Sequence, residues 1–209
     1  MTPLREVGLV FVSIQLIIWC GELLKISPFL IVIIPLTLVI NYWRKNTQNF
    51  KLSFCPMGTK SDYLMMAIVF ALFWQIIALI GGYWNPKFFA IHQLLPKMLK
   101  SVAFYFPWSF FQQLILNGYF YNRLRDGTSQ KNAILISGIL FSLTHLPNPV
   151  LLITTLIGGW LSAYFFKRTT NLYALAFAHA ILAVSIMHFL PGDWHHHLRI
   201  GPGYFHWTP

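Results

Sequence analysis

Charged residues are scarce in this 209-residue sequence, and acidic residues are scarcer still. Asp, Glu, Lys and Arg make up 10% of the chain, and only five residues are Asp or Glu; an ordinary soluble domain has about 25% charged residues. Hydrophobic residues make up 56%, and the mean hydropathy is +0.60. This balance excludes an ordinary soluble domain and predicts an integral membrane protein built from helices.

Cysteine is almost absent, and the residues that bind metals do not cluster. Cys20 and Cys55 have no metal-ligand spacing, so we interpret both as free thiols. His145 and His179 offer two ligands, whereas a zinc site usually needs three or four. We therefore expect no metal and no cofactor, with haem held between the two histidines as a less favoured alternative.

Long apolar runs predict one all-α membrane domain over residues 1–209, a polytopic transmembrane helical bundle of about seven spans. A polar loop over 44–62 and an interfacial segment over 85–100 separate some of the spans. The tail, 191–209, contains His195-His196-His197 and is too polar to span, so we expect an interfacial segment folded back over the mouth of the bundle. The predicted spans are 7–24, 28–43, 63–82, 101–122, 132–146, 150–166 and 171–190.

The formal charge of +10 comes from basic residues that flank these apolar runs. With the N-terminus inside, ten Lys and Arg residues lie on the inner side and five on the outer side, so the positive-inside rule favours this orientation in a cell (inner) membrane. Because the sequence has no basic stripe, we expect membrane lipids as partners and no nucleic acid.

Five polar side chains interrupt the later apolar runs. Gln112, Gln113 and Asn117 belong to the fourth predicted span, His145 ends the fifth, and His179 lies near the middle of the seventh. Polar groups at membrane depth are costly, so they usually face the interior of a bundle and mark a functional site. They are expected to line one polar chamber, with Gln112 adjacent to it. The alternative is that they only join helices through hydrogen bonds.

The order and spacing of these residues form a recognisable pattern. Gln112-Gln113-x-x-x-Asn117 is followed 32 residues after Gln113 by His145, which ends the motif Phe141-x-x-x-His145 and precedes Leu-Pro-Asn. A further 34 residues lead to His179. Over residues 101–190 this pattern resembles the CAAX protease and bacteriocin-processing family of glutamic-type intramembrane proteases, which carry E-E-x-x-x-R, then F-x-x-x-H, then H-x-x-x-N.

The departures from the family pattern fall on the groups that the resemblance makes catalytic. In that family a glutamate and a histidine are taken to activate a water that attacks a peptide carbonyl. Here Gln112 and Gln113 replace the glutamates, Asn117 replaces the arginine, and Ala183 replaces the final asparagine. A carboxamide does not titrate in this range and cannot take the proton from water. The glutamates and the arginine of the pattern are expected to be lost together, because burying an arginine without its counter-charge costs free energy.

Three interpretations of the site stay open from the sequence. The glutamines are engineered replacements, or the chain is a natural variant that binds a transmembrane or lipidated peptide, a lipid or a partner subunit. Alternatively, it still hydrolyses peptides, with His145 or His179 as the base. The resemblance implies an intramembrane endopeptidase, while the residues leave its activity open. A non-enzymatic structural or assembly subunit of a membrane complex is the general alternative.

Overall fold

The computed structural model describes residues 1–23, 28–85 and 91–206, and within these ranges the chain forms helices and turns without a strand. The helical elements, in chain order, are α1 (Pro3–Leu23), α2 (Pro28–Lys45), α3 (Thr47–Leu52), α4 (Lys60–Trp84), α5 (Ile91–Gln113), η2 (Leu114–Tyr121), α6 (Asn122–Arg125), α7 (Gln130–Leu143), α8 (Pro149–Thr169), α9 (Leu172–Phe189), α10 (Gly192–His195), η3 (His196–Leu198) and η4 (Gly201–Tyr204).

Short polar side chains define where the long helices begin. Thr59 and Asp62 form a capping box at the start of α4, and Ser129 accepts a hydrogen bond from the N–H of Asn132 at the start of α7. Asn148 and Asn171 cap α8 and α9 in the same way. Each cap satisfies an N–H group that has no partner inside its helix, which fixes the register of the following span.

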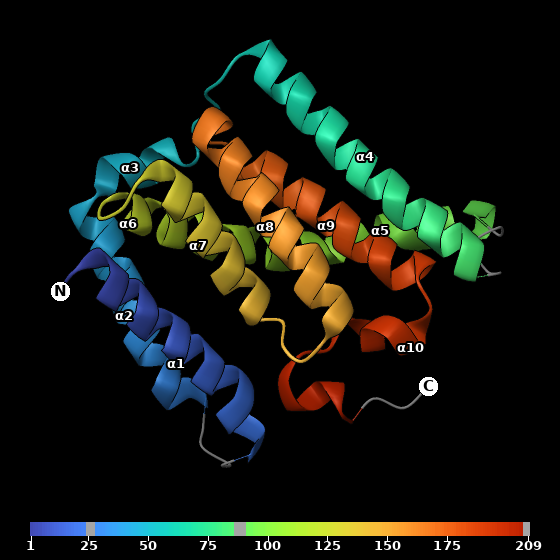
Figure 1. Cartoon of the computed structure of the whole chain (residues 1–209), viewed down its shortest axis with the longest axis horizontal. Coiled ribbons are helices and arrows are strands. Elements are labelled where there is room, and N and C mark those ends of the chain that lie inside the picture. The colour runs from blue at the N-terminus through green and yellow to red at the C-terminus, as the bar shows by residue number, and fades with distance from the viewer. Residues whose placement is uncertain (24–27, 86–90, 207–209) are drawn as a thin grey trace.

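The helices pack as neighbouring pairs (Figure 1). α1 packs along α2, α7 along α8, and α5 along α9, while α4 lies against α9 and α8 on the side away from α1 and α2. Hydrogen bonds join distant helices: the indole N–H of Trp74 donates to Ser185 Oγ over 2.9 Å, and Gln15 Nε2 donates to the carbonyl of Leu143 over 2.8 Å. Such bonds matter in a lipid environment, where apolar burial alone does not drive helices together.

The predicted all-helical membrane bundle is confirmed. Among the described residues, four segments are long and apolar enough to cross a bilayer: Pro3–Cys20 of α1, and the whole of α4, α8 and α9. α7 has 14 residues, or roughly 21 Å at 1.5 Å per residue, which is shorter than the roughly 30 Å hydrocarbon core. The total of about seven spans and the inside location of the N-terminus stay predictions.

The structure differs from the sequence-based elements in two places. Residues 91–100 form the first part of α5 and are not a separate segment, while their expected interfacial position stays a prediction. Residues 86–90 of that segment lie outside the described part of the chain. Helical hydrogen bonding continues through Pro96 and Pro107, because neighbouring helices compensate for prolines in a membrane bundle. The loop predicted over 44–62 contains the short helix α3.

Candidate functional site

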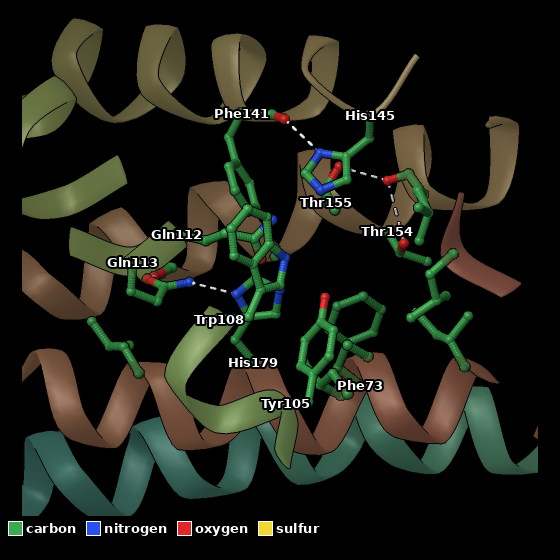
Figure 2. A pocket seen from close by; sticks show the side chains of 18 of the residues that line it. Phe73, Tyr105, Trp108, Gln112, Gln113, Phe141, His145, Thr154, Thr155 and His179 are labelled. Atoms are coloured by element: carbon green, nitrogen blue, oxygen red, sulfur yellow. Dashed lines mark hydrogen bonds between the residues drawn. The ribbon is translucent and has the colours of Figure 1, made fainter. Parts of the chain in front are cut away.

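One cavity of about 100 Å³ lies between α4, α5, α7, α8 and α9, and residues of the C-terminal tail complete its wall (Figure 2). Four of the five polar residues singled out in the sequence line it: Gln112, Gln113, His145 and His179. Figure 2 shows them with the aromatic side chains of Phe73, Tyr105, Trp108 and Phe141 around the same space. The cavity is therefore a small polar site within largely apolar walls.

Gln113 is the best-connected polar side chain of the site. Its Oε1 accepts hydrogen bonds from Asn117 Nδ2 over 2.7 Å and from Ser162 Oγ over 2.6 Å. Its Nε2 lies 3.1 Å from Nδ1 of His179, to which it donates. Asn117 Nδ2 also donates to Ser162 Oγ over 2.9 Å, which closes a triangle of hydrogen bonds linking residues of α5, η2 and α8. Gln113 is 3% exposed, so this network holds it rigidly inside the bundle.

Asn117 lies behind this wall and does not line the cavity, which corrects the expected arrangement. Its side chain reaches Gln113 and Ser162, and its Oδ1 is buried without a hydrogen-bond partner among the described residues. Gln112, expected to lie beside the chamber, lines it instead. Gln112 Oε1 is likewise buried without a partner among the described residues, so it is an acceptor with capacity to receive a hydrogen bond.

His145 follows the last turn of α7, and its ring is oriented by the helix end. Nδ1 lies 2.8 Å from the carbonyl oxygen of Phe141 and 3.2 Å from Thr144 Oγ1. A carbonyl only accepts, so Nδ1 carries the proton and Nε2 keeps its lone pair. His145 is 6% exposed and lines the cavity. The motif Phe141-x-x-x-His145 thus has a structural reason: the first residue supplies the carbonyl that fixes the tautomer of the second.

His179 has the opposite tautomer. Because Gln113 Nε2 donates to its Nδ1, the proton of the neutral ring lies on Nε2. The ring of Phe141 packs edge-to-face against both imidazoles, with centroid distances of 4.9 Å to His145 and 5.8 Å to His179. The site therefore combines an acceptor nitrogen on His145, a donor N–H on His179 and an acceptor oxygen on Gln112.

Three contributors to this site were not predicted from the sequence. Ser162 lies on α8 and bonds both Gln113 and Asn117; its position within an apolar run was the available signal. Leu198 and Ile200 line the cavity from the tail, and nothing in their local pattern pointed to that role. The polypeptide also changes from α-helix to a π-helical segment, η2, directly after Gln113, and such segments are frequent at functional sites.

Histidine, cysteine and acidic side chains do not gather into a metal-ligand set among the described residues. No group of three or more His, Cys, Asp or Glu side chains that could hold a metal ion occurs in the described parts of the chain. The cavity walls also contain no carboxylate among the described lining residues. The polar groups of the described lining residues are carboxamides, imidazoles and hydroxyls.

Comparison with protein families agrees with the motif order. Residues 94–185 match the family described as type II CAAX prenyl endopeptidase Rce1-like. The match includes all five predicted site residues and extends from α5 to α9. Over this stretch the chain is similar to the CAAX protease family, as the resemblance indicated, and the chain is a CAAX protease-like integral membrane protein. No curated protein and no solved structure matches the chain.

Proposed function

We propose that this protein is a peptide-binding member of the CAAX protease family. In this proposal the cavity captures a backbone amide of a transmembrane or lipidated peptide and does not cleave it through a glutamate-activated water. One observation carries the proposal: the described cavity lining offers Gln112 Oε1, His145 Nε2 and His179 Nε2–H but no carboxylate. A peptide bond presents one N–H donor and one C=O acceptor, which complement such groups.

Gln113 supports the same proposal because its side chain is already hydrogen-bonded within the protein. Both polar atoms of its carboxamide are engaged, with Asn117 and Ser162 on Oε1 and His179 on Nε2. A group held in this way gives the site a fixed shape but accepts no proton from water. Gln113 is therefore a positioning residue for His179, while Gln112 is the carboxamide that contacts the bound peptide.

Hydrolysis without glutamate is the second candidate, and the geometry of His145 favours it. Its Nδ1–H is bound by the Phe141 carbonyl, which leaves the Nε2 lone pair as a base. In such a reaction Nε2 takes a proton from water as the water oxygen attacks the peptide carbonyl. The same proton then passes to the leaving amine nitrogen as the C–N bond breaks.

One experiment separates the candidates. The purified protein in lipid nanodiscs is mixed with a panel of prenylated and single-span peptides carrying a photo-crosslinking group, and both crosslinks and cleavage products are measured by mass spectrometry. We expect crosslinks within 94–185 and no product. Gln112→Leu should weaken binding up to about tenfold, the effect of one hydrogen bond. Gln113→Glu tests whether restoring an acid restores cleavage.

The other results would each overturn the proposal. Product that disappears in His145→Ala establishes the histidine-dependent hydrolase instead. Absence of crosslinks across the panel, together with a fixed partner that copurifies in constant ratio, supports a structural or assembly subunit.

A further inference from the structure

The tail after α9 returns to the bundle and forms part of the cavity wall. In Figure 1 the red segment runs from the end of α9 back past the connection between α7 and α8. Leu198 and Ile200 contribute to the cavity wall. Leu198 and Tyr105 also line a shallow neighbouring groove of about 270 Å³ between α5 and α9. Leu198 therefore lines both the cavity and the neighbouring groove.

Hydrogen bonds to the backbone of the tail hold it against the α7–α8 connection. Nδ2 of Asn148 donates to the carbonyls of His195 and Arg199 over 2.8 and 3.1 Å, while its Oδ1 caps α8. The N–H of Gly201 donates to the carbonyl of Leu146 over 2.8 Å. Asn148 thus binds the tail through Nδ2 and caps α8 through Oδ1. These two roles give a structural reason for the asparagine that follows His145-Leu-Pro.

The docked tail is under backbone strain where it reaches the cavity. His196, His197 and Leu198 have φ values of 45°, 52° and 59°, in the left-handed region that favours glycine. Three successive residues of this kind persist only where surrounding contacts enforce them. Here those contacts include Asn148, and the ring of His196, which stacks on Tyr204 at a centroid distance of 4.0 Å.

We propose that residues 192–204 form a strained lid whose gate residue is Leu198. When the lid lifts, the cavity joins the groove beside Tyr105, and a ligand enters between α5 and α9. Release of the left-handed conformation offsets part of the cost of breaking the Asn148 and Gly201 hydrogen bonds. The proposal concerns access to the cavity and does not depend on what the cavity binds.

Glycine positions in the tail supply a matched pair of variants. A Cβ at Gly201, whose φ is 57°, would lie 2.7 Å from Ile18 Cγ2 and 3.1 Å from the Ile18 carbonyl oxygen. Gly201→Ala therefore pushes the lid away from α1. A Cβ at Gly203 meets nothing within 4 Å, so Gly203→Ala is the control on the same element. In the opposite direction, His197→Gly relieves strain at an exposed position and favours the closed lid.

The measurement is the reaction rate of a thiol placed inside the cavity. In a background with Cys20 and Cys55 replaced by alanine, Ala183→Cys puts a reporter on the wall of the cavity, and N-ethylmaleimide is added to the folded protein. We expect Gly201→Ala to accelerate labelling about tenfold and His197→Gly to slow it about tenfold, the effect of one left-handed residue. Gly203→Ala should match the parent, and Leu198→Ala should accelerate labelling by widening the passage.

Two results would overturn the proposal of a lid. One is equal labelling in Gly201→Ala and Gly203→Ala; the other is a parent rate equal to that of the unfolded protein. If Gly201→Ala fails to fold, His197→Gly decides alone, and an unchanged rate in that variant rejects the proposal. Because no peptide is added, this outcome is independent of whether the cavity binds peptides.

Discussion

Gln113 Nε2 and His179 Nδ1 lie 3.1 Å apart, which joins α5 to α9 across 66 residues of sequence. This contact makes a carboxamide the orienting partner of an imidazole. An acid at that position would have offered a charged partner instead, and Asn117 would then have faced a carboxylate. A glutamine at this position therefore gives the site an uncharged hydrogen-bonding partner and leaves it packed and hydrogen-bonded.

The two glutamines should differ sharply in their contribution to stability. Gln113→Ala removes the acceptor of the Ser162 hydroxyl, the donor to His179 Nδ1 and one of the two acceptors of Asn117 Nδ2. We therefore expect a loss of about 2 kcal/mol in the free energy of unfolding. Gln112→Ala removes a side chain whose Oε1 has no partner among the described residues, and it should change stability by less than about 0.5 kcal/mol. Thermal unfolding of both variants in one detergent tests this order; equal losses would contradict the network.

The two adjacent glycines of α8 should respond differently to alanine. A Cβ at Gly159 would lie 3.0 Å from Gly138 Cα and 3.3 Å from Phe141 Cδ1, so Gly159→Ala forces α7 and α8 apart. We expect a cost of about 1–3 kcal/mol. A Cβ at Gly158 meets only Phe73 at 3.8 Å, and Gly158→Ala should gain up to about 1 kcal/mol from helix propensity. Melting temperatures of the pair measure the difference, and a reversed order would reject the close approach of these helices.

The ion pair between Arg123 of α6 and Glu6 of α1 should contribute more to stability than the neighbouring pair of Arg123 and Asp126. Arg123 lies 2.8 Å from Glu6, which also accepts a hydrogen bond from Tyr119, and the Arg123 and Glu6 side chains are 16% and 14% exposed. Glu6→Gln should cost about 1–2 kcal/mol. Asp126 is 3.6 Å from Arg123 and more exposed, so Asp126→Asn should cost less than about 0.5 kcal/mol. Chemical denaturation of both variants gives the comparison; a larger effect at Asp126 would disprove the ranking.

The docked tail should weaken in acid because of His195. Burial lowers the pKa of this imidazole. The hydrogen bond to the Leu190 carbonyl opposes that effect in part, and the neighbouring His197, His196 and His188 lower the pKa further. The folded protein then binds fewer protons than the unfolded chain, so stability falls as the pH drops below about 6.5, the ordinary histidine value, toward the lower folded pKa. Above that window His195 is neutral in both states.

Melting temperatures between pH 8 and pH 5 measure this effect. His195→Phe keeps a ring at the buried position and removes the titration, so its melting temperature should fall less on acidification than that of the parent. Identical profiles of melting temperature against pH for the two proteins would show that His195 does not cause the loss of stability in acid.

Much of the fold follows from local sequence. Apolar runs, Asn148 and Asn171 at helix starts, and Pro and Gly between helices define the elements, because capping and hydrophobicity act over a few residues. The continuation of α5 back to Ile91 was missed because Pro96 and Pro107 break helices in isolation, whereas the surrounding bundle supports them.

The sequence alone determined the kind of protein and the chemical types at its site: an apolar helical chain with an ordered set of two glutamines, an asparagine and two histidines, and no acid among them. Only the tertiary structure decided their roles. It placed Gln112 in the cavity lining and Asn117 behind it, bonded Ser162 to both Gln113 and Asn117, and brought Leu198 of the tail into the cavity wall. Hydrogen bonds and packing between distant helices fix those choices, and no local pattern encodes a contact between residues so far apart in the chain.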